Sequence, residues 1–123
     1  MDYLKKFNDI FCDMIGDLVV VFPNDSELRL YKFAVEATIA SDAFLANRIF
    51  NECVAIPYGD KIQSKDETFF LEKDYEEYTA GDQNTMEIFG KLKNCWKDLN
   101  EENRNTVWKY LRVMLNLNAK IHQ

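Results

Sequence analysis

Apolar residues near the start of the chain recur at alternating steps of three and four, which is the spacing of one face of an α-helix. Ile10 and Ile15 flank this stripe, so it is wider than a coiled-coil seam and favours a helix in a bundle over a dimerising zipper. Pro23 disfavours helical geometry at Phe22 and should end the helix there. The residues of the stripe are Leu4, Phe7, Phe11, Met14, Leu18 and Val21.

Two further helices are predicted before residue 60. Asn24 and Glu27 resemble a capping box, and we expect Ser41 to cap the next helix in turn. Pro57 and Gly59 should end that third helix. The expected buried positions are Leu28, Tyr31, Val35, Thr38 and Ile39 in the second helix, and Leu45, Ile49, Cys53 and Ile56, broadened by Phe44 and Phe50, in the third.

The middle of the chain predicts a short fourth helix and then a fifth. Ser64 and Glu67 form an S-x-x-E box, which starts a helix from Asp66 to about Tyr78, and Ala80–Gly81 closes it. Asn84 and Glu87 cap the fifth helix. The apolar residues assigned to the fourth helix are Phe70, Leu71 and Tyr75, and those assigned to the fifth are Ile88, Phe89, Leu92, Cys95, Trp96 and Leu99.

We expect the stretch from Trp96 to Ile121 to be central to the fold, because it contains a long helix that is apolar over more than half of its circumference. Asn100 is a suitable N-cap, and Glu101 and Glu102 lie at the positive end of the helix dipole. So wide a face indicates either the central helix of a small bundle, which we favour, or a helix covered on a second side by a partner. The face comprises Val107, Leu111, Met114, Leu115 and Ile121, widened by Trp108, Tyr110, Val113 and Leu117.

Asn118 falls in the middle of this apolar arc. A buried amide without a hydrogen bond costs about 1 to 3 kcal/mol, so a buried Asn118 should have a partner. We favour the alternative that the last turn frays into water. The other interpretation is a polar group that sets the register between packed helices.

Length and composition place these helices in one domain, residues 1–123. A chain of 123 residues with four glycines and two prolines has a core but few helix breaks. We therefore expect an all-α fold, a compact bundle of five or six helices in which a short turn makes the last two an antiparallel hairpin. The sequence has no apolar run long enough to span a membrane, and we expect no signal peptide. The expected location is intracellular, with reduced core thiols favoured over a disulfide for Cys12, Cys53 and Cys95.

Charge is distributed unevenly along the chain. Residues 66–82 carry seven acids against Lys73 alone, whereas residues 91–123 carry seven bases against three acids. An acidic chain with dispersed bases is a poor non-specific ligand for phosphate, so we expect no direct nucleic-acid binding. The basic residues are best explained as a solvated face. They are Lys91, Lys93, Lys97, Arg104, Lys109, Arg112 and Lys120.

Familiar catalytic chemistry has little support in the sequence. The only histidine, His122, is next to the last residue given and is expected to fray, and the four glycines are isolated, which excludes a Gly-rich phosphate loop. No cysteine pair has metal-ligand spacing, and the acids of residues 66–82 lack the pattern of an EF-hand loop. We expect no catalytic residues, no cofactor and no metal site, and regard these acids as a solvated face.

Four segments of the chain resemble those of short helical proteins encoded by nucleocytoplasmic large DNA viruses of algae and protists. The segments are NRIFNECVAIPY, IQSKDETFFLE, IFGKLKNCWKDL and NRNTVWKYLRVMLNL. The resemblance covers about the last two thirds of the chain. It implies a viral product that acts in the infected host cell or is packaged in a virion, and it transfers no active site.

Three functions fit these observations. We favour a non-enzymatic protein-interaction or structural module that uses an apolar, aromatic helix face to bind itself or another protein, virion component or host protein. Exposed aromatic and aliphatic residues of the last helix would anchor the partner, flanked by two arginines. The alternatives are an acidic surface that competes for a basic or nucleic-acid-binding partner, and an enzyme with an unfamiliar carboxylate site. The expected partner-binding residues are Trp108, Tyr110, Val113, Leu117, Arg104 and Arg112.

Overall fold

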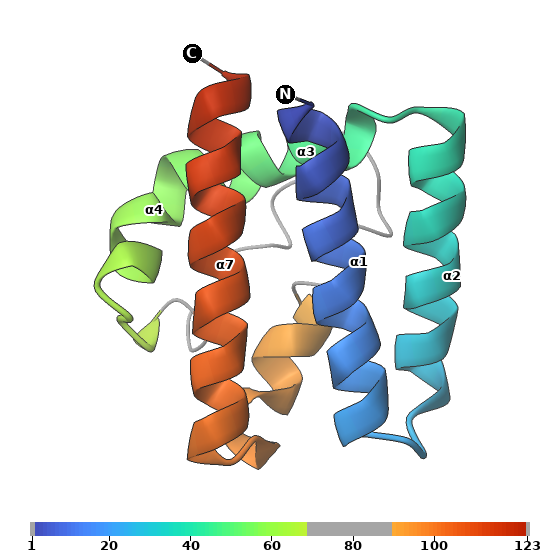
Figure 1. Ribbon diagram of the computed structural model, residues 1–123. Helices are drawn as coiled ribbons and strands as arrows, with labels where there is room; N and C mark the ends of the chain where they lie inside the picture. The colour runs from blue at the N-terminus through green and yellow to red at the C-terminus, as the bar shows by residue number, and fades with distance from the viewer. Residues whose placement is uncertain (1, 69–89, 123) are drawn as a thin grey trace.

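The computed structural model describes residues 2–68 and 90–122, and every regular element in these ranges is helical (Figure 1). The elements are α1 (Tyr3–Val21), α2 (Ser26–Ser41), α3 (Leu45–Phe50), the π-helix η1 (Asn51–Ala55), α4 (Ile56–Gln63), the 3₁₀-helix η3 (Trp96–Asp98) and α7 (Glu101–Ile121). A helical segment over residues 90–95 leads into η3. The all-α prediction is confirmed for this part of the chain. The predicted helix between residues 66 and 78, its closing turn, and the cap at Asn84 and Glu87 lie largely or wholly outside it.

The starts of the long helices are fixed by side-chain caps. Asp2 Oδ1 accepts from the backbone N–H of Lys5 at 2.9 Å, and Asn100 Oδ1 accepts from that of Asn103 at 2.8 Å. The predicted cap at Asn100 is therefore confirmed. The second helix instead begins one residue later than expected, because Asp25 rather than Asn24 accepts from the first-turn amides.

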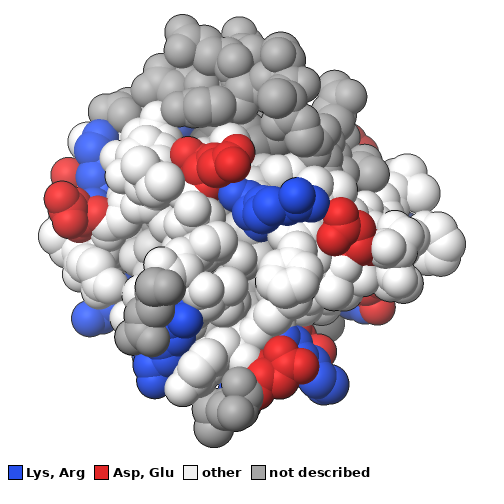
Figure 2. All heavy atoms as spheres, turned by 90° about the horizontal axis from the view of Figure 1, so that it is seen from above, with Lys and Arg blue, Asp and Glu red and all other residues white. Residues whose placement is uncertain are grey.

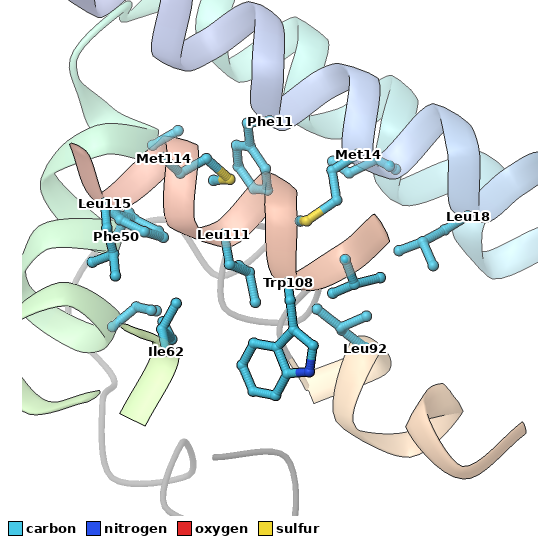
Figure 3. Packing of buried hydrophobic residues seen from close by; sticks show 14 of the residues in the cluster. Phe11, Met14, Leu18, Phe50, Ile62, Leu92, Trp108, Leu111, Met114 and Leu115 are labelled. Atoms are coloured by element: carbon cyan, nitrogen blue, oxygen red, sulfur yellow. The ribbon is translucent and has the colours of Figure 1, made fainter. Parts of the chain in front are cut away.

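The core forms where α7 runs beside α1. Figure 3 shows Phe11 and Met14 projecting from α1 toward Leu111 and Met114 of α7, and all four side chains are fully buried. Elements from the middle of the chain pack on the other side of α7, since both η1 and α4 contact it. Figure 1 shows α7 between α4 and α1, with α2 on the far side of α1.

The third predicted helix differs from the structure at both ends. Ser41 is the last residue of α2 rather than a cap, and the N-cap of α3 is Phe44, which makes no side-chain capping bond. Pro57 and Gly59 do not stop the helical path, because the π turn η1 precedes Pro57 and the proline lies in the first turn of α4. Proline cannot donate to a carbonyl of the preceding turn, and a π turn is one of the places where a helix accommodates such a break in its hydrogen-bond ladder.

The π turn also changes which residues face the core. A π turn contains more residues than an α turn, so the apolar periodicity shifts beyond it. Ile56, which α-helical spacing placed on the buried side, is 73% exposed, and Tyr58 and Ile62 are buried in its place. Ser64 ends α4 as its C-cap, and its hydroxyl donates to the carbonyl of Asp60 at 3.0 Å. The predicted S-x-x-E box is therefore wrong.

Candidate functional site

The wide apolar face of α7 is mostly covered by the protein itself. Trp108 is only 3% exposed, and its ring meets Trp96 edge to face with the centroids 5.4 Å apart. In Figure 3 it points from α7 toward the space between Ile62 and Leu92. Leu117 packs partly buried against the core. Trp108 was expected to anchor a partner at the surface, and its burial contradicts that expectation.

Tyr110 and Arg104 are also engaged within the chain. The Tyr110 hydroxyl donates to Asp17 Oδ2 of α1, and burial together with this carboxylate raises the pKa of Tyr110 to about 12. Arg104 donates from Nε to the carbonyl of Trp96 at 3.1 Å, and its guanidinium carbon lies 5.1 Å from the centroid of that indole ring. It also pairs with Glu67, with Nη1 and Oε1 separated by 3.5 Å. These side chains hold elements together.

The remaining two predicted residues of α7 lie at the surface. Val113 is 42% exposed and Arg112 is exposed. One aliphatic and one charged side chain make a much smaller surface than the six-residue site expected from the sequence.

Asn118 is a buried member of a polar cluster, so the expectation that it frays into water is wrong. It is 5% exposed and lies within the regular part of α7. Asn47 Nδ2 donates to Asn118 Oδ1 at 3.1 Å, and Asn118 Nδ2 donates to Asn51 Oδ1 at 2.9 Å. His122 Nε2 lies 2.7 Å from Asn47 Oδ1, which as an amide oxygen can only accept, so this ring nitrogen carries the proton. We call Asn47, Asn51, Asn118 and His122 the amide cluster.

The amide cluster borders a groove of about 350 Å³ between α4 and α7. Its walls include the amides of Asn51, Gln63 and Asn116 and the carboxylate of Asp60. Both polar atoms of Asn118 are bonded within the protein. The cluster therefore fixes α7 against α3 and η1, which is the register-setting role that the sequence offered as the second interpretation.

A second, larger hollow of about 620 Å³ lies at the turn between α1 and α2. Lys91 borders it and pairs with Asp25 at 2.8 Å, and Asp25 is also the N-cap of α2. The hydrogen bond to Lys91 is the main cause that lowers the pKa of Asp25, and the same bond raises the pKa of Lys91. The pair thus ties the helical segment before η3 to the start of α2.

The described residues contain no group of three or more His, Cys, Asp or Glu side chains arranged to hold a metal ion. Five of the seven acids in residues 66–82 lie outside these ranges. The three cysteines are free thiols, as the sequence predicted, with Cys53 and Cys95 buried and Cys12 half-buried. Among the described helices, none has the length and apolar character needed to cross a membrane.

The most extensive exposed apolar surface on one described helix lies on α2. Phe33 is 73% exposed and Leu30 is 66% exposed. The two residues are three positions apart in the sequence, so they are neighbours on the helix surface. They point away from Leu28 and Val35, which are buried against the core. We call this surface the α2 outer face; its exposed residues, none of them charged, are Ser26, Leu30, Phe33, Ala37, Ala40 and Ser41.

The position of α2 explains why this face is uncovered. Its main contacts are with α1 and α3, and Figure 1 shows it at the edge of the described helices. In Figure 2, seen from above, the outermost atoms on this side are uncharged. The α2 outer face is an apolar strip bordered by charges, as at the centre of many protein interfaces.

The sequence contained a signal for this face. Leu30 and Phe33 lie on the side of the helix opposite its buried positions. Glu36 is the one charged residue between Phe33 and Ala37 in the sequence, and it lies at the border of the face. The apolar arc of α7 is larger but mostly buried. Searches against protein-family descriptions, curated proteins and solved structures found no match to this chain.

Proposed function

We propose that the protein is a non-enzymatic interaction module that binds protein through the α2 outer face. One observation carries this proposal: α2 is apolar on two opposite sides, and only one of them packs against the protein. A helix that covers a core normally directs charged and polar residues to solvent on its other face. Here the solvent side offers Phe33 and Leu30 with no charge between them.

Single exposed apolar residues are ordinary, so contiguity is what supports the proposal. Leu30 and Ala37 occupy the positions three before and four after Phe33, which makes the three side chains one strip along the helix. Interface centres are poor in charge and rich in aromatic residues, and aromatic anchors contribute much of the binding energy. Phe33 is the natural anchor of this strip.

The proposal keeps the function class expected from the sequence and moves its surface from α7 to α2. We further propose that the partner is encountered in an infected host cell or a virion, as the resemblance to proteins of large DNA viruses implies. The proposal also includes a compact bundle, with the helical segment that ends at Asp98 pairing antiparallel with α7. Only Leu99 and Asn100 connect these two elements, and short connections favour antiparallel neighbours.

Site-directed photo-crosslinking in cells that express the protein tests this function. A benzoylphenylalanine replaces Phe33 in one variant and Lys109, an exposed residue of α7, in the control. We expect a discrete covalent adduct from position 33 that is absent from position 109. Equal crosslinking at the two positions, or none at position 33, would overturn the proposal.

A further inference from the structure

The charges that border the α2 outer face identify its occupant. Arg29 lies four residues before Phe33 and Glu36 lies three residues after it, so the two flank Phe33 on the helix surface. They are seven residues apart, which is two helical turns, and therefore lie along the same edge of the strip. We infer that the occupant of the α2 outer face is a second copy of this chain, with the two α2 helices antiparallel; this inference rests on the proposed function.

A two-fold axis near Phe33 makes this edge complementary to itself. In a symmetric dimer the same patch lies on both sides of the interface, so each residue must suit its symmetry mate. Both residues lie on one edge of the strip. Antiparallel helices related by such an axis therefore place Arg29 of one copy opposite Glu36 of the other along this edge. Arg29 Nη1 donates to the carbonyl of Pro23 in its own chain, and the other N–H groups of the guanidinium are the donors for two Arg29–Glu36 ion pairs in this dimer. One pair lies on each side, along the helix, of the contact between the two Phe33 rings.

Two α2 helices can approach each other without net repulsion, although the whole chain is acidic. Glu27 and Glu36 are balanced by Arg29 and Lys32, so the helix is neutral within a chain of net charge −6. Lys32 Nζ already pairs with Glu36 Oε1 at 3.0 Å. That pair leaves Glu36 a second carboxylate oxygen to accept from a guanidinium.

The size of the surface sets the strength of the dimer. A helix of 16 residues is about 24 Å long, and one face about 10 Å wide covers a few hundred Å² on each copy. This is less than the roughly 800 Å² per partner of a standard stable interface. We therefore expect the dimer to be weak and reversible.

Charge reversal in the full-length chain tests the pairing by sedimentation equilibrium from about 10 µM to 1 mM. Arg29→Glu or Glu36→Arg alone places like charges across the interface, and each should weaken self-association at least tenfold. An equimolar mixture of the two single variants should associate about as well as wild type, and so should the double variant R29E/E36R. Neither restoration is expected if the two residues act separately.

The controls make equal changes in net charge elsewhere on the surface. Arg112→Glu on α7 and Glu52→Arg in η1 alter exposed residues and should leave self-association within about twofold of wild type. Far-UV circular dichroism verifies that each variant is folded. A wild-type chain that is monomeric at 1 mM, or a mixture no tighter than either variant alone, would overturn the inference. A crosslink from position 33 to a different protein, with a monomeric purified chain, would overturn this inference and leave the proposed function standing.

Discussion

Replacement of Asn118 by alanine should destabilise the protein far more than its position near the end of the last helix suggests. The side chain makes hydrogen bonds to Asn47 and Asn51, at 3.1 Å and 2.9 Å. Two such bonds contribute about 1 to 3 kcal/mol together, at 0.5 to 1.5 kcal/mol each. The variant also leaves the Nδ2 group of Asn47, a fully buried residue, without this acceptor, and an unsatisfied buried donor costs a further 1 to 3 kcal/mol or so.

Alanine is the better helix former, which offsets this loss by about 0.5 kcal/mol. Asn116→Ala is the matched control, because Asn116 is exposed two residues earlier in the same helix and gains the same propensity. We therefore expect Asn118→Ala to lose about 3 kcal/mol of unfolding free energy relative to Asn116→Ala. With a urea dependence near 2 kcal/mol per M, the difference is a shift of about 1.5 M in the unfolding midpoint.

Urea unfolding followed by circular dichroism measures both midpoints. A double-mutant cycle with Asn47→Ala then isolates the coupling between the two amides, which should amount to at least about 1 kcal/mol. Midpoints that agree within about 0.3 M for Asn118→Ala and Asn116→Ala would refute the reasoning. Such agreement would mean that the last turns of α7 are frayed in solution and the amide cluster is not formed.

Three further predictions concern titratable groups. In alkaline absorbance titration Tyr110 should ionise near pH 12, and Asp17→Asn should lower that pKa. The pKa of Tyr110 is higher in the folded than in the unfolded chain, so the stability that the protonated hydroxyl contributes is complete below pH 10 and is lost as the pH rises to about 12. Lys91 lowers the pKa of Asp25, so acid unfolding curves should show stability lost as the pH falls below the unfolded pKa of about 3.8, and Asp25→Asn should reduce that loss. Burial raises the pKa of Cys12 from 9.0 to about 11, so its rate of alkylation at pH 8 should be about a hundredfold lower in the native chain than in urea, and equal rates would contradict the structure.

The local signals in the sequence predicted what depends on neighbours along the chain. The end of α1 follows from a proline and the cap at Asn100 from a capping side chain, and the structure has both. The buried side of α2, with Leu28 and Val35, was also predicted correctly. These features are local because a helix and its cap are made within a few residues.

Errors arose where contacts distant in sequence decide the outcome. Serine is a common N-cap residue, yet the structure places Ser41 and Ser64 at the C-terminal ends of helices. Their hydroxyls donate there to preceding carbonyls. The fate of Asn118 depends on Asn47, 71 positions earlier in the chain, and the two come together only when α3 packs against the end of α7. A single apolar arc with one asparagine cannot reveal a partner so far away.

A comparison of α7 with α2 shows why periodicity alone could not locate the candidate site. The pattern records that α7 is apolar over a wide arc and that α2 is apolar on two opposite sides, but not what lies beside each helix. Tertiary packing supplies α7 with neighbours on both flanks, α1 on one and α4 on the other, and Trp108 is buried. Among the described elements the main neighbours of α2 are α1 and α3, and Phe33 on its exposed side lies in solvent. The helix with the wide apolar arc is therefore the one whose surface is mostly buried in the core, and α2 is the one that keeps an exposed apolar side.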